Sequence, residues 1–346
     1  MLSQSTNHIL LIKPAEFYCN EQTIETNHYQ ILDKKKTKKE MLQEALLEFK
    51  AFENNLKRNK IKVTTLMGQV GCPDNIFPNW AVSHNDQTID LFSMLGKNRR
   101  LEKSKKHISF LNQTYSTKND YSDSENESIF LEGTSSLVLD RINHLAYMGI
   151  SGRSDPDLAQ QWCNSRGYKL IKFSTKSHTG NAIYHTDVMM YIGTELAVVC
   201  SECIDNNTRE LVLESLQSTH HIMEISSEQL ISFCGNCIEV CDENNESHLI
   251  MSSTAYQSYS KQQKEVLLKH YKSIIHSKLE SIEKYGGGCH QKIGVSNEKT
   301  IFGDIFTIKG ITDDNVVLNT RKINRESKNE DLWKSISSEN IFPLNL

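Results

Sequence analysis

One unit recurs through the middle of this chain, and it limits the fold more than any other feature of the sequence. Residues 136–139 and 144–148 have the pattern of a β-hairpin, and the helix that follows begins with Asp155 and Pro156. Aspartate before proline is a frequent helix start, because aspartate caps free backbone N–H groups and proline has none to satisfy. An apolar strand at residues 168–173 completes the unit.

The same order of two strands, a helix and a strand occurs twice more. The second copy has strands 188–192 and 196–200, helix 208–217 and strand 221–225. The third copy has strands 237–241 and 249–252, a helix that begins with the capping-box pattern at 260–263, and strand 273–276. Corresponding positions lie about 50 residues apart, a period typical of propellers and repeat arrays. The residues before the first copy have room for two less regular copies. We therefore predict an α/β fold of five ββαβ units around a pseudo-fivefold axis, with loops that converge at its centre.

The first part of the chain has a compatible pattern. Residues 8–12 are apolar and end before Pro14, and residues 61–66 alternate between polar and apolar side chains, so both are predicted strands. Between them, from Thr37 to about Arg58, apolar residues recur every three or four positions, which is typical of an amphipathic helix. The loop at 72–80 then leads to a predicted strand near residue 89.

The regular pattern stops after Gly294. Residues 306–308 and 316–318 predict one further hairpin, and a polar tail follows it. We therefore divide the chain into a main domain at residues 1–306 and a C-terminal appendix at residues 307–346. The sequence assigns no role to the appendix.

Composition excludes several classes of function. The 346 residues are 38% hydrophobic and 24% charged, with a formal net charge of −4. The basic run at residues 34–39 is explained by a solvated helix start, so no nucleic-acid partner is expected. No apolar run approaches the roughly 20 residues of a membrane span, and the first residues lack a signal-peptide pattern. We expect a cytoplasmic protein without a membrane partner.

The nine cysteines are an odd number, and several lie inside apolar strands, which favours reduced thiols over a disulfide framework. The pairs Cys200 and Cys203, and Cys234 and Cys237, resemble the ligand spacing of a four-thiolate zinc site. However, the two pairs are farther apart than is typical, and no glycines follow them. Buried core thiols are therefore favoured over zinc, and no metal site is expected.

Three polar stretches fall where the loops of the repeat should converge. They are residues 131–134, residues 184–187 and the glycine-rich residues 286–292. His185 can act as a general acid or base, and Asp187, two residues on, can hold a cationic group on the same side. Taken alone this spacing is weak, because most such pairs are hydrogen-bonded surface or core residues. Three glycines in a row indicate backbone that approaches something closely or adopts positive φ.

At these residues the sequence resembles the guanidino-group-modifying enzymes of the pentein fold, in particular the arginine deiminase-related citrulline hydrolases of the amidinotransferase-like group. The resemblance runs from about residue 9 to residue 288. It is carried by residues 10–15, 73–80, 98–100, 131–141, 184–190, 233–236, 251–256 and 282–283, followed by the triple glycine.

The resemblance implies a five-bladed α/β propeller and a central pocket for a small guanidino or ureido ligand, with no cofactor. It makes His185 the catalytic histidine and Glu132 the acid that orients it or binds the guanidino nitrogens. The implied substrate-binding residues are Asp74, Asn79, Arg153 and Asp187. Arg153 would hold a substrate carboxylate, because the guanidinium fork pairs with it bidentately. Asp187 favours a guanidinium ligand, since citrulline-directed members tend to have asparagine there.

The nucleophile departs from the pattern of the family. The cysteine expected after the glycine loop aligns without a gap with Lys292, and with an insertion it aligns with Thr300. An amine must be desolvated to lose its proton and forms no readily hydrolysed intermediate. Cys289, three residues before Lys292, is the thiol that a rebuilt loop could use.

Two classes of function follow from the resemblance. The first is a hydrolase or amidinotransferase that acts on arginine-like or citrulline-like compounds, with Cys289 as an unusual nucleophile. The second is a catalytically inactive pentein that binds an arginine-like ligand or a protein partner. The sequence leaves open whether the chain forms a homodimer.

Overall fold

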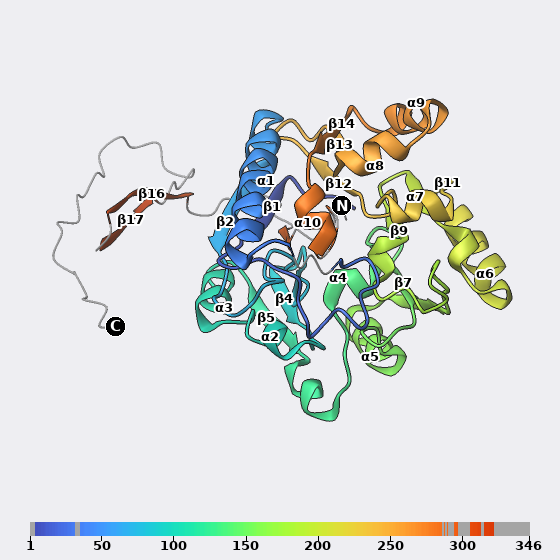
Figure 1. Cartoon of the computed structure of the whole chain (residues 1–346), viewed down its shortest axis with the longest axis horizontal. Coiled ribbons are helices and arrows are strands. Elements are labelled where there is room, and N and C mark those ends of the chain that lie inside the picture. The colour runs from blue at the N-terminus through green and yellow to red at the C-terminus, as the bar shows by residue number, and fades with distance from the viewer. Residues whose placement is uncertain are drawn as a thin grey trace, which may run out of the picture. The chain divides into compact units, whose positions relative to one another are not determined.

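The computed structural model describes residues 4–31, 35–285, 287 and 289, and the backbone of three further strands (Figure 1). Residue contacts divide the chain into two units, Met1–Glu298 and Lys299–Leu346. The second unit contains the antiparallel strands β16 (Ile305–Thr312) and β17 (Asn315–Arg321). This is the hairpin predicted from the sequence, whereas the domain boundary after residue 306 stays a prediction.

The first unit contains five three-stranded sheets among its described residues, and all five share one strand order. In each sheet the central strand pairs antiparallel with one neighbour and parallel with the other. The sheets are β15 (Gly294–Ser296), β1 (His8–Lys13) and β2 (Lys62–Met67); β3 (Ala81–Ser83), β4 (Thr88–Leu91) and β5 (Ser116–Asp120); β6 (Val138–Asp140), β7 (Leu145–Gly149) and β8 (Lys169–Phe173); β9 (Met190–Ile192), β10 (Leu196–Val199) and β11 (His221–Glu224); and β12 (Ile238–Cys241), β13 (Ser247–Ser252) and β14 (Ser273–Ser277).

A helix lies in sequence between the two parallel strands of every sheet. These connecting helices are α1 (Lys38–Arg58), α3 (Lys105–Leu111), α5 (Pro156–Arg166), α6 (Asn206–Gln217) and α9 (Lys261–His270). The ββαβ order predicted from the sequence is therefore confirmed in four of these sheets, and the fold is mixed α/β. In the sheet of β1 and β2 the antiparallel strand is β15, which comes late in the chain and does not precede β1. In Figure 1 the connecting helices lie at the outside of this unit. No helix within the described residues is long and apolar enough to cross a membrane.

Shorter helices complete the unit. They are α2 (Lys97–Arg100), α4 (Gly133–Ser136), α7 (Ser227–Ile231), α8 (Ser253–Ser258) and α10 (Glu280–Tyr285), with the 3-10 turns η1 (Ser122–Glu127), η2 (Thr186–Val188) and η3 (Ser201–Cys203). Of these, α4 and α10 lie inside the ring of connecting helices in Figure 1. The α4 helix begins within the polar stretch 131–134, and α10 ends just before the glycine-rich residues 286–292.

Local sequence signals set the helix boundaries as expected. The Thr37 side chain caps α1 in a capping box with Glu40, and Asp155 accepts hydrogen bonds at the start of α5. The α5 helix ends at Gly167, whose φ of 73° is the left-handed conformation that glycine adopts without strain. Ser260 caps α9 through the predicted capping box. These caps satisfy backbone groups that the helix ends leave free.

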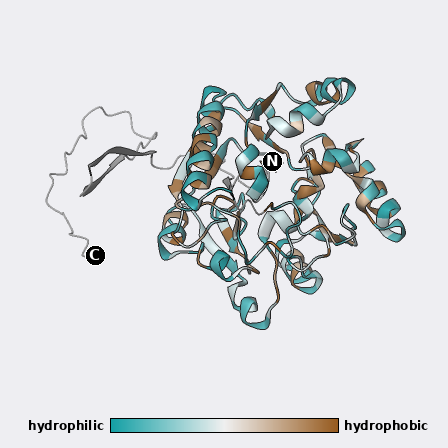
Figure 2. Ribbon diagram, viewed as in Figure 1, coloured by the Kyte–Doolittle hydropathy of each residue, from teal (hydrophilic) through white to brown (hydrophobic). Residues whose placement is uncertain are grey.

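The apolar core lies between the sheets and the connecting helices. The face of α1 that packs on it carries Met41, Ala45, Phe49, Phe52 and Leu56. Figure 2 shows hydrophobic and hydrophilic residues alternating along this helix, as its period requires.

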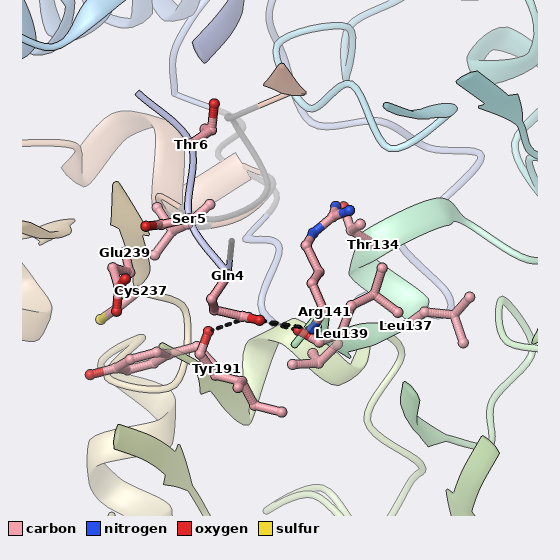
Figure 3. A pocket seen from close by; sticks show the side chains of 13 residues that line it. Gln4, Ser5, Thr6, Thr134, Leu137, Leu139, Arg141, Tyr191, Cys237 and Glu239 are labelled. Carbon is pink, nitrogen blue, oxygen red and sulfur yellow. Dashed lines mark hydrogen bonds between the residues drawn. The ribbon is translucent and has the colours of Figure 1, made fainter. Parts of the chain in front are cut away.

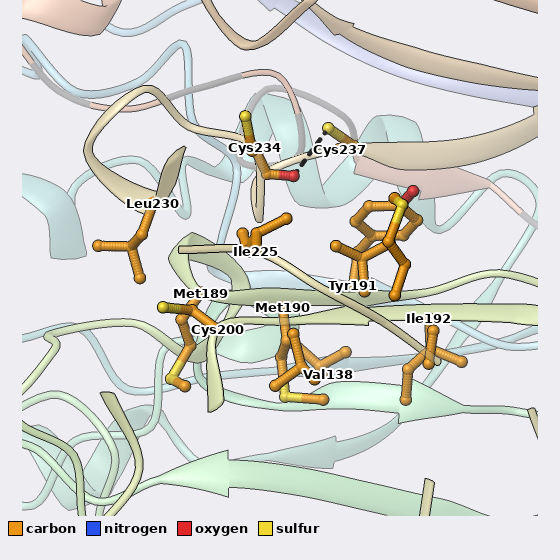
Figure 4. Close-up of a cluster of buried hydrophobic side chains, with 14 of the residues drawn as sticks. Val138, Met189, Met190, Tyr191, Ile192, Cys200, Ile225, Leu230, Cys234 and Cys237 are labelled. Carbon is orange, nitrogen blue, oxygen red and sulfur yellow. Dashed lines mark hydrogen bonds between the residues drawn. The ribbon is translucent and has the colours of Figure 1, made fainter. Parts of the chain in front are cut away.

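The largest cluster surrounds β9 and β10 and contains four buried thiols, which are Cys200, Cys203, Cys234 and Cys237 (Figure 4). Each of these cysteines is free of a disulfide and surrounded by apolar side chains. The prediction of buried core thiols is confirmed at these positions.

Candidate functional site

Gly133 fixes the start of α4 and, through it, the position of Glu132. Its φ is +51°, and a Cβ atom there would lie 2.3 Å from the backbone oxygen of Asn79. Both facts require glycine, because any side chain would clash with backbone and strain the turn. The close approach packs α4 against the loop at 72–80. The backbone N–H of Glu132 donates to the backbone oxygen of Arg153 at 3.2 Å, which ties a third segment to this point.

Glu132 and His185 form the centre of the site. His185 Nε2 lies 2.7 Å from Glu132 Oε2, and both side chains are buried. The same carboxylate oxygen lies 3.4 Å from Arg99 Nη1 and 3.6 Å from Arg153 Nη1. The other oxygen accepts a hydrogen bond of 3.0 Å from the backbone N–H of Leu95. Two guanidinium groups and one imidazole therefore converge on a single buried carboxylate.

This arrangement sets the ionisation of both groups. Burial alone would raise the pKa of Glu132, but the charge of Arg153 and the hydrogen bond with His185 hold that pKa below its usual range. Burial lowers the pKa of His185 to about 4, even though the contact with Glu132 favours the charged form. At neutral pH the site therefore holds an ionised Glu132 and a neutral His185 that donates its Nε2 proton to it.

Asp74 is a second buried carboxylate near this pair. Its Oδ2 accepts hydrogen bonds from Asn20 Nδ2 at 2.7 Å and from Thr23 Oγ1 at 3.2 Å. Its Oδ1 is buried and has no hydrogen-bond partner among the described residues. Burial raises the pKa of Asp74, although the charge of Arg99 works against that rise. Asp74 therefore has one oxygen that can still accept a donor.

Arg99 links these carboxylates to a third one. Its Nε and Nη2 atoms lie 3.0 and 3.2 Å from the two oxygens of Glu102, and Nη2 also donates to the backbone oxygen of Phe77. Burial raises the pKa of Glu102 to about 8, because the attraction of Arg99 compensates only part of its desolvation. Within the described part of the chain, Asp74, Glu102 and Glu132 thus share the two arginines Arg99 and Arg153. The formal charge of this group is −1 when every member is ionised.

Arg153 is held by the N-terminal segment. Its Nε donates to Thr26 Oγ1 at 3.0 Å, and its Nη2 donates to the backbone oxygen of Thr23 at 2.9 Å. The guanidinium also lies over the ring of Tyr184, 4.9 Å from its centroid. The side chain is only 2% exposed. Arg153 therefore neutralises Glu132 and anchors the segment that crosses the site.

A small cavity of about 10 Å³ lies beside these groups. We call it the Glu132 cavity, because Glu132 does not line it but contacts three of its lining residues, Arg99, Arg153 and His185. Its lining residues are Asn27, Gln30, Asp74, Phe77, Asn79, Arg99, Arg153, Tyr184 and His185. This volume corresponds to space for about one water molecule. The structure thus brings together Glu132, His185, Asp74, Asn79 and Arg153, all of which were singled out from the sequence.

Asp187 and Cys289 lie apart from the lining of the Glu132 cavity. Asp187 is buried in η2 and accepts a hydrogen bond of 2.9 Å from Ser135 Oγ. Cys289 is fully buried in the apolar cluster that contains Phe17 and Tyr285. The residues at 286, 288 and 290–293 lie outside the described part of the chain, and so do Lys292 and Thr300.

Several site residues were not anticipated from the sequence. Arg99 lies in the stretch 98–100 that carried part of the resemblance, but no role was given to it. The N-terminal segment contributes the polar residues Asn20, Thr23, Asn27 and Gln30. Their spacing of three and four residues in an otherwise irregular loop is a signal that could have identified them. Among the described residues, no three His, Cys, Asp or Glu side chains gather as a metal site would require.

Comparison with solved structures identifies proteins of similar fold. The substrate-bound N-terminal domain of ArgZ, an arginine dihydrolase from the ornithine-ammonia cycle in Cyanobacteria, has a TM-score of 0.67 and 16% identity, over 84% of this chain and 98% of that domain. AgrE with L-arginine has a TM-score of 0.64 and 17% identity, over 83% of this chain and 39% of AgrE. A dimethylarginine dimethylaminohydrolase adduct with S-methyl-L-thiocitrulline has a TM-score of 0.59 and 14% identity, over 86% and 100% of the chains.

These neighbours share the fold of the pentein guanidino-modifying superfamily, as the sequence resemblance implied. Among individually curated proteins, no sequence matches this chain. The model of one protein family matches residues 13–291, which is most of the chain. The chain belongs to that family, the eukaryotic N,N dimethylarginine dimethylhydrolases.

Proposed function

We propose that this protein binds the guanidino group of an arginine-like compound in the Glu132 cavity and hydrolyses it. Water would replace one nitrogen of the guanidino group, so that an amine or ammonia leaves and a ureido product remains. One observation carries the binding step: Asp74 Oδ1 is a buried acceptor of the cavity lining without a partner among the described residues. An unsatisfied buried acceptor costs about 1–3 kcal/mol, which a guanidinium N–H would recover.

The charges of the site favour a cationic ligand. Asp74, Glu102 and Glu132 exceed their two arginine partners by one negative charge, and the pKa of Glu102 is raised to about 8 by burial. A guanidinium bound beside Asp74 would balance the extra negative charge that appears when Glu102 ionises, and it would form charge-assisted hydrogen bonds. The cavity of about 10 Å³ is smaller than a guanidinium group, so binding requires the lining to move. The N-terminal segment with Asn27 and Gln30 forms part of that lining.

His185 is suited to proton transfer in this reaction. It is neutral at pH 7 and is oriented by Glu132 at 2.7 Å. A neutral imidazole can accept a proton from the nucleophile and return it to the departing amine, and Glu132 would stabilise the imidazolium formed between these steps. Asn79 lines the cavity and is proposed to contact the substrate, as is Asp187. Arg153 is proposed to hold the substrate carboxylate.

The identity of the nucleophile decides between two proposals, a hydrolase and a protein that binds its ligand without turnover. Cys289 Sγ would attack the guanidino carbon, and the amine would leave before water releases the product. In the structure Cys289 is fully buried among apolar side chains. That burial favours the alternative that the protein binds its ligand without turnover. Attack by Cys289 would require a rearrangement of its loop, because nucleophiles tolerate errors of only about an ångström.

A substrate panel tests both proposals. Arginine, an N-methylated arginine and citrulline would be incubated with the full chain, and ureido products, amines, ammonia and amidino transfer to an added amine would be followed by mass spectrometry. The hydrolase should release a ureido product, and its intact mass should show an adduct that maps to Cys289. Cys289→Ala and His185→Ala should abolish turnover, whereas Cys163→Ala, a change at another buried thiol, should preserve it. Arginine-dependent thermal stabilisation without any product would support the binding protein instead.

The common strand order of the five sheets supports a proposal about their arrangement. We propose that they are the blades of a pentein propeller, closed by the pairing of β15 with β1. A chain that ends after residue 293 would lose β15, whereas a chain that ends after residue 298 would keep the complete first unit. The first truncation should lower the thermal unfolding midpoint by several degrees relative to the second. Equal midpoints would contradict closure through β15.

A further inference from the structure

A second and larger cavity, of about 50 Å³, lies between β6, β9, β12, α4 and the start of the chain (Figure 3). The segment at residues 4–6 crosses it. Gln4 Nε2 donates to the backbone oxygens of Leu139 and Ile192, and Gln4 Oε1 accepts from the backbone N–H of Arg141. These bonds hold the chain start against two sheets. We call this space the Arg141 cavity, and none of its lining residues lines the Glu132 cavity.

Arg141 is the unusual group in this cavity. It follows β6 and is only 7% exposed. Among the described residues its guanidinium makes a single hydrogen bond, from Nη1 to the backbone oxygen of Ser83 at the long distance of 3.5 Å. No described carboxylate forms an ion pair with Arg141. A buried guanidinium has five N–H donors and a charge that is costly to desolvate without a partner. This side chain therefore lacks an anion.

The charged surroundings of Arg141 do not supply that anion. Burial lowers the pKa of Arg141, and the nearby positive charge of Arg166 lowers it further. The carboxylate nearest to Arg166, Asp90, is already bound by the imidazole of His84 and by Arg166 itself. Arg141 thus carries an unbalanced positive charge next to another cation. The cost of this arrangement would fall if an anion entered the cavity.

The remaining lining indicates what kind of anion fits. Figure 3 shows the Arg141 side chain extending toward Thr134, whose hydroxyl makes no hydrogen bond among the described residues. Leu137, Leu139 and Ile192 give the cavity an apolar wall. Glu239 also lines it, but Thr194 holds this carboxylate through its backbone N–H and hydroxyl at 2.7 and 2.5 Å. The lining therefore offers a cationic fork, a hydroxyl and aliphatic surface.

We propose that the Arg141 cavity binds a small carboxylate with a short aliphatic body. The planar guanidinium would pair with the carboxylate through two parallel hydrogen bonds, and Thr134 would donate a third. The aliphatic part would lie against Leu137, Leu139 and Ile192, which favours a carboxylate over phosphate. The α4 turn connects the two regions, because its N-cap Glu132 contacts His185 of the first cavity and Thr134 and Leu137 line the second one. This proposal does not depend on the function proposed for the Glu132 cavity.

Thermal unfolding of the full chain in sodium acetate, propionate or butyrate tests the proposal, with sodium chloride at equal ionic strength as the reference. The midpoint of the wild type should rise with carboxylate concentration by several degrees at saturation, and most with the longer acids. Calorimetric titration with butyrate should give one site per chain. The same unfolding measurement is repeated with inorganic phosphate in place of the carboxylate. An equal response to phosphate would overturn the carboxylate assignment, and no response beyond chloride would overturn the site.

Substitutions separate binding from a structural role. Arg141→Met should remove the carboxylate response and should unfold no earlier than the wild type in chloride, because it removes an unpaired buried cation. Arg141→Lys should weaken the response about tenfold, because it keeps the charge and loses the fork. Arg58→Met, a change at an exposed arginine of α1, should leave the response unchanged. If Arg141→Met unfolds earlier and Arg141→Lys binds normally, Arg141 is a structural residue and the proposal is wrong.

Discussion

Two groups among the described residues each bring a buried histidine, carboxylate and arginine into contact, and in one of them the histidine and the arginines line the Glu132 cavity. At the sheet of β3, β4 and β5, His84 Nε2 lies 3.0 Å from Asp90 Oδ2, and Arg166 binds both oxygens of Asp90. In the candidate site, His185 lies 2.7 Å from Glu132, beside Arg99 and Arg153. Their chemistry is nearly identical, so composition alone does not separate them.

The difference lies in what remains unsatisfied. Asp90 also accepts hydrogen bonds of 2.8 Å from Trp162 Nε1 and from Asn119 Nδ2, so donors occupy both of its oxygens. The site around Glu132 instead includes Asp74 Oδ1, which has no donor among the described residues, and one more carboxylate than it has arginines. A saturated network stabilises the fold, whereas surplus hydrogen-bonding capacity beside a cavity can hold a ligand. The comparison therefore teaches that unsatisfied groups, and not residue types, identify the site.

Removing the carboxylate of the saturated network should have the largest effect. Asp90→Ala would leave Arg166, His84 and Trp162 buried without their acceptor, so we expect a loss of about 3–5 kcal/mol in the free energy of unfolding. Urea denaturation followed by circular dichroism measures it. Asp86→Ala removes a half-exposed partner of Arg166 and should cost less than about 1 kcal/mol. Similar losses from the two variants would mean that the Asp90 network is not a structural unit.

The sequence predicted the strand order and the helix caps because those features depend on neighbouring residues. Spacing also predicted that Asp187 holds a cationic group on the same side as His185, but it does not indicate that His185 contacts Glu132, more than fifty positions earlier. Local spacing contains no information about which loops meet between sheets. The resemblance to a family supplied that contact, since it identified Glu132 as the orienting acid. The N-terminal segment with Asn27 was missed because its three- and four-residue spacing is formed by polar residues, whereas the elements were predicted from apolar periodicity.

Asp74→Asn should affect binding more than stability. The amide keeps the size of the side chain and removes the charge, so arginine should bind about 10–100-fold more weakly, the loss expected for a charge-assisted hydrogen bond. The free energy of unfolding should stay the same or rise, because burial raises the pKa of Asp74 and thus disfavours its charged form. Calorimetric titration and urea denaturation of the same samples measure both. A variant that unfolds easily but binds normally would place Asp74 with the structural network.

The next largest effect should be a pH dependence of arginine binding, which the candidate site should show and the Asp90 network should not. Glu102 has a pKa raised to about 8, so it carries its proton at neutral pH in the free protein. A bound cation favours the ionised form, so binding should release a proton, and affinity should increase by at most about tenfold per pH unit up to pH 8. Calorimetry in buffers of different ionisation enthalpy counts the proton. Glu102→Gln should abolish the proton release. If the affinity of the wild type for arginine fell between pH 7 and pH 8, the predicted role of Glu102 would be contradicted.

Replacing either of the two histidines should cost the same amount of stability, and far less than the Asp90→Ala variant. Burial lowers the pKa of His84 and of His185, so each is a neutral donor at pH 7 and contributes one hydrogen bond to a carboxylate. His84→Asn and His185→Asn should each cost about 1–2 kcal/mol in the free energy of unfolding. Only His185→Asn should reduce turnover in the substrate panel, because only His185 lines the Glu132 cavity. If both variants lost turnover equally, stability would explain the loss, and the proposed division between a structural and a functional network would fail.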